Sequence, residues 1–210
     1  MKKILSLIAV CLLVVGFTSC NDDDDKYEYQ SLTKEERAAQ LRDMVGNYTG
    51  TLYYNVNEYT NHADSANISA TIMAEDSTMT ISNLPLKIIA KRLESDRASK
   101  LDTTAVMPTL EANVSIYLPY GYLPEDSKLV HWFEFIPKGE NMLVKFPVTY
   151  NGQDRVMTVG YTTRYNTYPS NGAFSGKRIV LQFIINSVAI DGEFPAQYIY
   201  EVMNARLTRQ

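Results

Sequence analysis

The sequence predicts a mainly β fold: an antiparallel barrel or sandwich of about eight or nine strands, with one short helix before it and one inserted into it. Three observations lead to this prediction. Segments with apolar residues at every second position recur along the chain, turn residues separate them, and strands do not alternate with helices as in an α/β fold. With 45% hydrophobic and 21% charged residues, the composition is that of a folded protein, and residues 33–210 suffice for a single β domain.

The first element of this domain is expected to be a short amphipathic helix. Thr33 and Glu36 have the spacing of a capping box, in which each side chain bonds the backbone N–H of the other residue. Ala38 and Leu41 follow at helical spacing, and Gly46 ends the helix.

Nine later segments are predicted to be strands, because their apolar residues alternate and they are rich in Tyr, Thr and Ile. The second helix is expected at 85–99, where Pro85 suits the first helical position and Leu86, Ile89 and Leu93 lie on one face. The predicted strands are 48–54, 67–73, 78–82, 114–118, 131–136, 142–150, 155–162, 178–188 and 198–207.

The strongest local prediction is a hairpin at Asn151-Gly152, the preferred dipeptide of a type I′ turn. The turn fixes the register, with Pro147 opposite Val156. Since proline has no N–H to offer a second neighbour, its strand is expected to be an edge strand or to be bulged. The same register sets three pairs on the core face: Phe146 with Met157, Val144 with Val159, and Met142 with Tyr161.

The first twenty residues are interpreted as a signal peptide. Lys2 and Lys3 precede an apolar stretch, 4–17, that is too short to span a bilayer. The residues before Cys20, Phe-Thr-Ser, resemble the lipobox of bacterial lipoproteins, which implies that Cys20 carries the lipid that holds the protein on the membrane; a plain secretory signal is the alternative. The other cysteine lies in the removed segment, so the mature domain would have no thiol for catalysis and no disulfide.

Residues 21–32 are expected to be an acidic flexible tether, because 22–25 are four aspartates that repel one another and stay solvated. A run of acids just after the lipidated cysteine is also similar to the export signal of Bacteroidetes surface lipoproteins. That resemblance implies an outer-membrane protein exposed at the cell surface.

The start of the β domain resembles a second known group. Gly46-Asn47-Tyr48-Thr49-Gly50 is similar to the Gly-x-Tyr-x-Gly strand that opens the calycin-like, lipocalin-type barrels among uncharacterised Bacteroidetes lipoproteins. The resemblance implies that an arginine of the last strand covers Tyr48, and Arg206 is expected in that role. The helix expected at 85–99 has no counterpart in a lipocalin, so a closed barrel and an open one remain as two alternative architectures.

Several functional classes lack their motifs in this sequence. There is no nucleophile elbow, P-loop, dinucleotide fingerprint or His-Glu-x-x-His, so no enzyme activity, cofactor or metal is expected. His131 and Glu134 would lie on opposite faces of a strand. Asp191 and Glu193 fit a charged turn better than a catalytic pair. A net charge of −4 argues against nucleic acid as a partner.

Tyrosine is the residue in excess, with 15 copies against 7 Phe and 1 Trp. Tyrosines are common in strands, which is one explanation; an aromatic recognition surface is the other. If a ligand site exists, we expect it on the long loop 165–174 with an aromatic residue nearby. The candidate ligand-binding residues are Tyr120, Trp132, Tyr165, Tyr168 and Phe174.

Two short stretches, Asp64-Ser65-Ala66 and Asp102-Thr103-Thr104, resemble the O-glycosylation motif of exported Bacteroidetes proteins. The resemblance implies modification of Ser65 and Thr103, provided that both lie on accessible loops.

Three functional hypotheses follow. The first is a non-catalytic surface protein that binds a glycan, a peptide or a small apolar molecule at an open barrel end or on a tyrosine-lined face. The second is a structural or assembly subunit of an envelope complex that binds another protein along the edge marked by Pro147. The third, an enzyme acting on glycans, requires two acids facing each other across a cleft.

Overall fold

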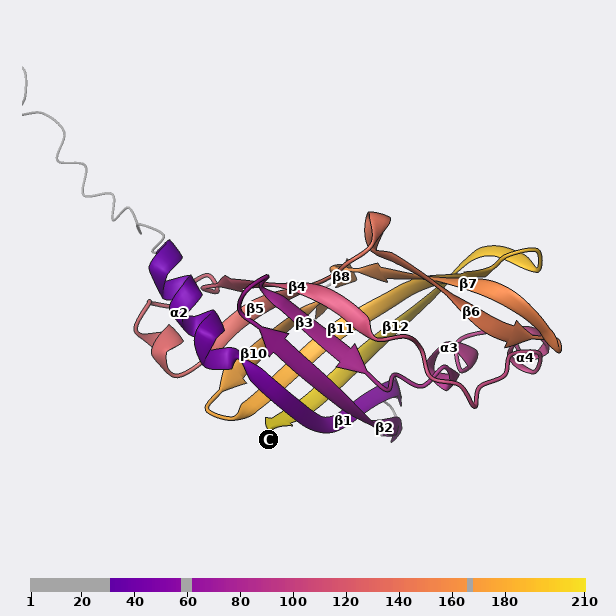
Figure 1. Cartoon of the computed structure of the whole chain (residues 1–210), viewed down its shortest axis with the longest axis horizontal. Coiled ribbons are helices and arrows are strands. Elements are labelled where there is room, and N and C mark those ends of the chain that lie inside the picture. The colour runs from indigo at the N-terminus through magenta and orange to yellow at the C-terminus, as the bar shows by residue number, and fades with distance from the viewer. Residues whose placement is uncertain (1–30, 58–61, 166–167) are drawn as a thin grey trace, which may run out of the picture.

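A computed structural model describes residues 31–57, 62–165 and 168–210 (Figure 1). The predicted signal peptide, Cys20 and most of the predicted tether lie outside these residues. The fold is mainly β, as predicted, with a ten-stranded antiparallel sheet that closes on itself. The main elements are α2 (Lys34–Met44), β1 (Gly46–Asn57), β2 (His62–Met73), β3 (Thr78–Ser82), α3 (Lys87–Ala90), α4 (Ser95–Ala98), β4 (Leu110–Tyr117), β5 (His131–Pro137), β6 (Leu143–Tyr150), β7 (Gln153–Thr162), β8 (Arg164–Tyr165), β9 (Tyr168–Pro169), β10 (Asn171–Ser175), β11 (Arg178–Ile190) and β12 (Phe194–Arg209).

Eight strands form the closed barrel, in the order β10-β5-β4-β3-β2-β1-β12-β11, and pairing of β10 with β11 completes the ring. β11 is long enough to have two partners on that side: residues 178–182 pair with β10, and residues 184–190 pair with β7. β6 then pairs with β7 and ends the sheet. We call β6, β7 and residues 184–201 of β11 and β12 the extension; it projects beyond the barrel in Figure 1.

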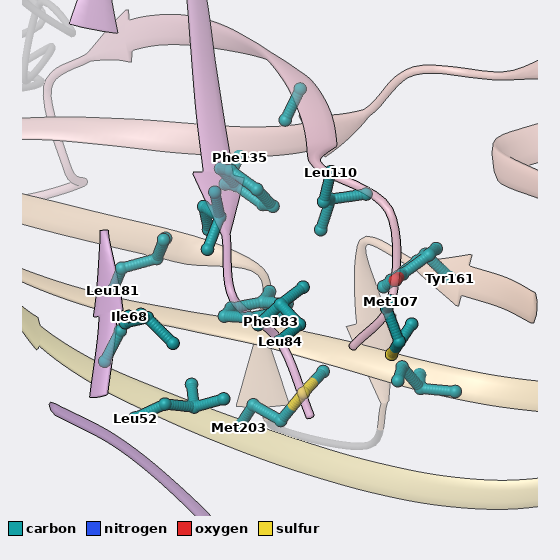
Figure 2. Close-up of a cluster of buried hydrophobic side chains, with 14 of the residues drawn as sticks. Leu52, Ile68, Leu84, Met107, Leu110, Phe135, Tyr161, Leu181, Phe183 and Met203 are labelled. Carbon is teal, nitrogen blue, oxygen red and sulfur yellow. The ribbon is translucent and has the colours of Figure 1, made fainter. Parts of the chain in front are cut away.

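Large apolar side chains fill the barrel interior. They come from alternate positions, as β4 illustrates: Leu110, Ala112, Val114 and Ile116 are buried and the residues between them are exposed or half-buried. Figure 2 shows how side chains from many strands meet there, with the rings of Phe135 and Phe183 centred 5.5 Å apart. A small barrel packed in this way has a solid core rather than a ligand cavity.

Helix α2 covers the end of the barrel where β1 begins. Its capping box is the predicted one: Thr33 Oγ1 accepts from the Glu36 N–H at 3.1 Å, and Glu36 accepts from the Thr33 N–H at 2.7 Å. These hydrogen bonds hold the pKa of Glu36 below its usual value. The helix buries Leu41 and Met44 against the barrel core.

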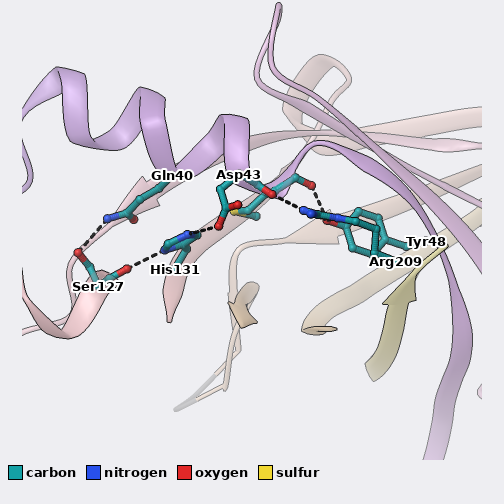
Figure 3. Close-up of polar contacts among 7 residues, drawn as sticks. Gln40, Asp43, Tyr48, Ser127, His131 and Arg209 are labelled. Atoms are coloured by element: carbon teal, nitrogen blue, oxygen red, sulfur yellow. Dashed lines mark hydrogen bonds and ion pairs between the residues drawn. The ribbon is translucent and has the colours of Figure 1, made fainter. Parts of the chain in front are cut away.

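An arginine of the last strand does cover Tyr48, but it is Arg209 and not Arg206. Arg209 lies directly opposite Tyr48 in the register, and its guanidinium donates to the Tyr48 hydroxyl at 3.0 and 3.2 Å (Figure 3). Arg206 is three residues earlier and therefore points to the other face of the strand, outside the barrel. Burial raises the pKa of Tyr48.

The segment 84–107, which we call the connecting segment, covers the opposite end, between β3 and β4. It was predicted to hold one helix at 85–99 but forms the short helices α3 and α4. Ile88 and Ile89 are both fully buried, so the chain is enclosed on more than one face and does not present a single apolar stripe. Glu94 has extended backbone angles that separate the two helices.

A fully buried carboxylate fixes the connecting segment to the strands. Glu201 on β12 pairs with Arg92 of the connecting segment and accepts from the backbone N–H of Asn55 on β1. A buried carboxylate requires such partners, because it has lost its hydration. The contact therefore joins β1, β12 and the connecting segment at one point.

The predicted hairpin register is confirmed for β6 and β7, including Phe146 opposite Met157 and Pro147 opposite Val156. The predicted pair of Met142 with Tyr161 is wrong. Met142 lies in a 3-10 turn before β6, and the pairing of β6 with β7 ends with Leu143 opposite Gly160. β6 is an edge strand, as its proline predicts. Its last residues meet the connecting segment through an isolated bridge between Leu101 and Tyr150.

Candidate ligand-binding face

The predicted loop 165–174 is largely strand. It contains the hairpin of β8 with β9, in which Tyr165 faces Tyr168, followed by β10, which closes the barrel. The side chains of Tyr165 and Tyr168 lie outside the described residues. β10 requires a glycine at position 172, since a Cβ there would lie 2.3 Å from the Phe133 ring. Tertiary packing, rather than local propensity, makes this segment a strand.

Phe174 and Trp132, both predicted to contact a ligand, lie on opposite faces of the barrel wall. Phe174 is opposite His131 in the register and is 1% exposed inside the barrel. Its ring stacks on His131 at 5.6 Å and under the Arg209 guanidinium at 5.0 Å, so it is a core residue. Trp132 is opposite Ala173 and is half-buried on the outer face.

Trp132 lines a groove of about 250 Å³ on the outer face of the barrel. The groove crosses β5, β10, β11 and β12. Three of its side chains are amides from three different strands: Asn171, Gln182 and Asn204. Gly172, Ala173 and Val180 complete the lining, and Val180 is exposed. The site therefore combines an indole, an aliphatic patch and several uncharged hydrogen-bonding groups.

Hydrogen bonds to neighbouring groups hold two of the three amides of the groove in place. Asn171 Nδ2 donates to the Tyr117 hydroxyl at 3.2 Å, and Gln182 Nε2 donates to the Pro169 carbonyl at 2.9 Å. An amide has two N–H donors and a carbonyl with two lone pairs, so each side chain keeps further groups for a ligand. The amides are thus oriented before any ligand arrives.

Tyr122 packs against Trp132, with ring centroids 4.7 Å apart and planes tilted by 58°. Tyr120, the predicted residue nearby in sequence, is 87% exposed. The tyrosine cluster of 117–122 does contribute to the groove, but through Tyr117 and Tyr122.

The strand register places the groove in two rows of outward side chains that run around the barrel. In one row, each residue lies opposite the next on the neighbouring strand: Tyr117, Trp132, Ala173, Val180, Arg206, Thr51 and Asn67. The second row is Ser115, Glu134, Asn171, Gln182, Asn204, Tyr53 and Ser65. A third row follows on four of these strands: Ser175, Arg178, Thr208 and Thr49. We call the outward residues of the three rows on β10, β11, β12 and β1 the outer face.

The polar cluster under α2 is structural (Figure 3). His131 is buried between two acceptors, with Nδ1 at 2.7 Å from the Ser127 carbonyl and Nε2 at 2.9 Å from the Asp43 carboxylate. Gln40 donates to the Ser127 hydroxyl at 2.8 Å. These bonds join α2 to the start of β5 and occupy both ring nitrogens of His131. Glu134 is exposed on the opposite face, as predicted.

The acidic pair of the sequence analysis, Asp191 and Glu193, lies in the turn between β11 and β12. Glu193 pairs with Arg155 at 2.9 Å beside the turn between β11 and β12, which fits the charged-turn interpretation. The described residues contain no group of three or more His, Cys, Asp or Glu side chains placed to hold a metal ion.

The two predicted modification positions differ in accessibility. Ser65 is exposed but lies within β2 and not on the expected loop. Thr103 lies in a turn and is half-buried. The preceding Asp102 accepts two hydrogen bonds from Thr104, which lower its pKa and hold the turn together.

The three amides and Arg206 were not predicted as ligand-binding residues. Asn171 precedes a glycine and therefore resembles a turn residue. Gln182 and Asn204 were predicted to lie in strands, but the sequence did not identify the strands beside them. Their outward positions follow from alternation within β11 and β12, which the sequence does show. Their proximity to Trp132 depends on β10, which the sequence did not reveal.

Comparison with known proteins identifies the family of this chain. Residues 43–190 match the family described as a domain of unknown function (DUF4840), and because this match covers most of the chain, the protein belongs to that family. No curated protein and no solved structure matches the chain. Among the helices of the described residues, none has the length and apolar content needed to cross a membrane.

Proposed function

We propose that this protein is a non-catalytic glycan-binding protein held on the cell envelope by a lipid. The observation that carries the binding role is the groove beside the outer face, in which Trp132 lies with three amides, two of them oriented by hydrogen bonds. An aromatic ring packs against the C–H face of a sugar, while amides exchange hydrogen bonds with its hydroxyls.

The packing of the barrel interior favours a ligand site on the outside of the barrel over one inside it. Buried side chains fill the interior, α2 covers one end and the connecting segment covers the other. A small apolar molecule would have to displace packed side chains such as Phe135 or Phe183, which is unfavourable. A ligand on the outer face displaces only water.

The order of strands around the ring supports the calycin-like relationship. Consecutive ring strands are also consecutive in the chain, except that residues 138–170 leave the ring between β5 and β10. The first strand pairs with the last, and Arg209 covers Tyr48. An up-and-down barrel of eight strands with this closure has the architecture of the lipocalin group.

The groove is tested by a glycan array with three forms of the full-length chain. Trp132→Ala should lose the signal of the wild type, while Tyr198→Ala, which removes a 70% exposed aromatic from the extension, should retain it. Stacking of one ring is worth about 0.5–1.5 kcal/mol beyond its buried area, so a loss of tenfold or more in affinity is expected. Equal binding by Trp132→Ala and the wild type would refute the site.

The anchor is tested separately by cell fractionation. Cys20→Ala should move the protein from the outer-membrane fraction to the soluble fraction, because acyl chains on the cysteine would supply the membrane affinity. Protease applied to intact cells should digest the wild type if it faces outward. Retention of Cys20→Ala in the membrane would contradict lipid anchoring.

An assembly role is the alternative, and the edge of β6 is the observation that favours it. In the β6–β7 register the backbone N–H groups of residues 143, 145 and 149 point away from β7, whereas position 147 has none because it is proline. A partner strand could therefore bond along 143–145. Lys145→Pro removes one outward N–H without disturbing β7, and loss of a co-purifying envelope protein in this variant would favour the assembly role.

A further inference from the structure

All charged residues of the outer face are positive. On β10, β11, β12 and β1, its outward residues include two arginines and no acidic residue, although the chain has 24 acidic against 20 basic residues. The nearest acid in the rows is Glu134 on β5, beyond Asn171. The outward residues are Asn171, Ala173, Ser175, Arg178, Val180, Gln182, Asn204, Arg206, Thr208, Thr49, Thr51 and Tyr53.

The two arginines are diagonal neighbours. Arg178 lies opposite Thr208, and Arg206 lies opposite Val180, so the arginines are separated by one strand and two positions along it. Like charges at this separation repel each other. Within the described part of the chain, neither arginine forms an ion pair within 4.0 Å. An anion bound beside them would relieve this repulsion.

Arg206 is held on the face by Tyr53, whose ring centre lies 5.4 Å from the guanidinium carbon. Stacking on an aromatic ring leaves the edge of the guanidinium, which carries its N–H groups, open to a planar anion. Arginine binds carboxylate and sulfate-like groups through two parallel N–H donors, and such bonds are stronger than neutral ones.

We propose that the groove binds an acidic oligosaccharide, with one sugar ring on Trp132 and a carboxylate or sulfate group at Arg206 and Arg178. This inference rests on the proposed glycan-binding function and names its ligand class. Trp132 and Arg206 lie in the same row, three strands apart, which is about 14 Å at the usual strand spacing. One sugar cannot contact both residues, so the ligand must be an oligomer.

The residues between these two contacts fit the middle of such a ligand. Val180 offers an apolar surface for a ring face, and Gln182 and Asn204, in the adjacent row, offer amides for hydroxyls. Beyond Arg206, a second groove of about 460 Å³ continues over β1 and β2 and is lined by uncharged polar residues, among them Thr51 and Asn67. This groove can take neutral sugars that follow the acidic one.

The chain provides a selective probe, because Trp132 is its only tryptophan. Fluorescence of the full-length protein, excited at wavelengths that its 15 tyrosines do not absorb, therefore reports on the surroundings of Trp132. We would titrate three hexasaccharide sets: oligogalacturonate and hyaluronan fragments for carboxylates, heparin fragments for sulfates, and methyl-esterified oligogalacturonate with maltohexaose as neutral controls. The acidic sugars should change the fluorescence of Trp132 at concentrations at least about tenfold lower than the neutral ones.

Charge variants assign the effect to the arginines. Arg206→Gln and Arg178→Gln should each weaken binding of the acidic hexasaccharide by about fivefold or more, while binding of neutral sugars should not change. Lys145→Gln, which removes an exposed positive charge from β6, is the matched control and should bind as the wild type does. Raising NaCl to about 0.5 M should weaken acidic binding, because salt screens exposed charges.

The outcomes separate this inference from the proposed function. If neutral sugars bind as well as acidic ones, or if the arginine variants bind acidic sugars normally, the acidic ligand class is wrong and glycan binding stands. If no hexasaccharide alters Trp132 fluorescence and none is detected on the array, both are wrong. If heparin binds and the carboxylate sugars do not, the anion is a sulfate.

Discussion

The barrel and the extension bury their apolar side chains in different ways. Each barrel strand is bonded to a neighbour on both sides, so closure alone leaves no edge and encloses the core. The extension ends at β6, and within the described residues the outer edge of this strand bonds to the connecting segment at its last residues. An open sheet of this kind needs a cover, and the short helices α3 and α4 with the contact between Arg92 and Glu201 provide it. The closed ring thus pairs all of its own strand edges, whereas the extension depends on the connecting segment to cover its apolar side chains.

The largest effect is expected in the barrel core. Phe135→Ala should lower the free energy of unfolding by about 4 kcal/mol, because the cavity would be surrounded by closed sheet and could not collapse. Phe146→Ala is the matched change in the extension and should cost less, since its strand is an edge that can move inward. Chemical denaturation measures the free energy of unfolding of both variants. Equal losses would mean that the barrel and the extension respond to a cavity in the same way.

The next largest effect concerns the cover of the extension. Arg92→Met should destabilise the protein by about 3 kcal/mol, because it leaves the buried Glu201 carboxylate without its cation. Hydrogen exchange should then accelerate in residues 84–107 more than in β3 or β4. Lys91→Met is the control, since Lys91 is half exposed and its pair with Asp64, at 3.6 Å, should contribute at most about 1 kcal/mol. Uniform acceleration in both regions would mean that they unfold together.

A smaller loss is expected where β10 closes the ring. Gly172→Ala should cost about 2 kcal/mol, because the new Cβ would overlap the Phe133 ring, 2.3 Å away. Adding Phe133→Leu should recover part of this loss by making space, and a thermal melt of the single and double variants would reveal it. If the double variant is no more stable than the sum of the single changes predicts, closure does not depend on this contact.

The smallest effect belongs to the cap of α2. Thr33→Ala should lower the free energy of unfolding by about 1 kcal/mol, since the Glu36 N–H loses its acceptor. Thr33→Ser keeps the hydroxyl and should be nearly neutral. Calorimetry of the three proteins compares them directly, and an unchanged Thr33→Ala would indicate that packing of Leu41 and Met44 alone holds α2 on the barrel.

Local sequence signals predicted the features that depend on short stretches of chain. The capping box at Thr33, the hairpin at Asn151 and the edge position of β6 are all set by residues close in sequence, and all three are confirmed. The antiparallel, mainly β class followed from alternation in the same way. These features need no knowledge of distant partners.

The missed features depend on contacts between distant segments. β10 has a weak strand sequence and forms because β5 and β11 bond it on both sides. The interior arginine is Arg209 because Arg209 lies opposite Tyr48 in the pairing of β1 with β12, and no turn joins these strands to fix their register in the sequence. Trp132 was predicted as a candidate, but its amide neighbours were not, since they lie on strands that only the closed ring brings together.

The place of β12 in the ring has a consequence for how the protein is made. Among the strands of the sheet, β12 leaves the ribosome last, yet it lies between β1 and β11 and bonds to both. Until its final residues emerge, β1 and β11 each keep a bare edge that can pair with another chain. The barrel can therefore close only after residues 194–209 have left the ribosome, and its wide sequence separations predict slow folding that needs protection from aggregation. Deleting even the last four residues, which include Arg209, should leave a chain that aggregates before it can fold.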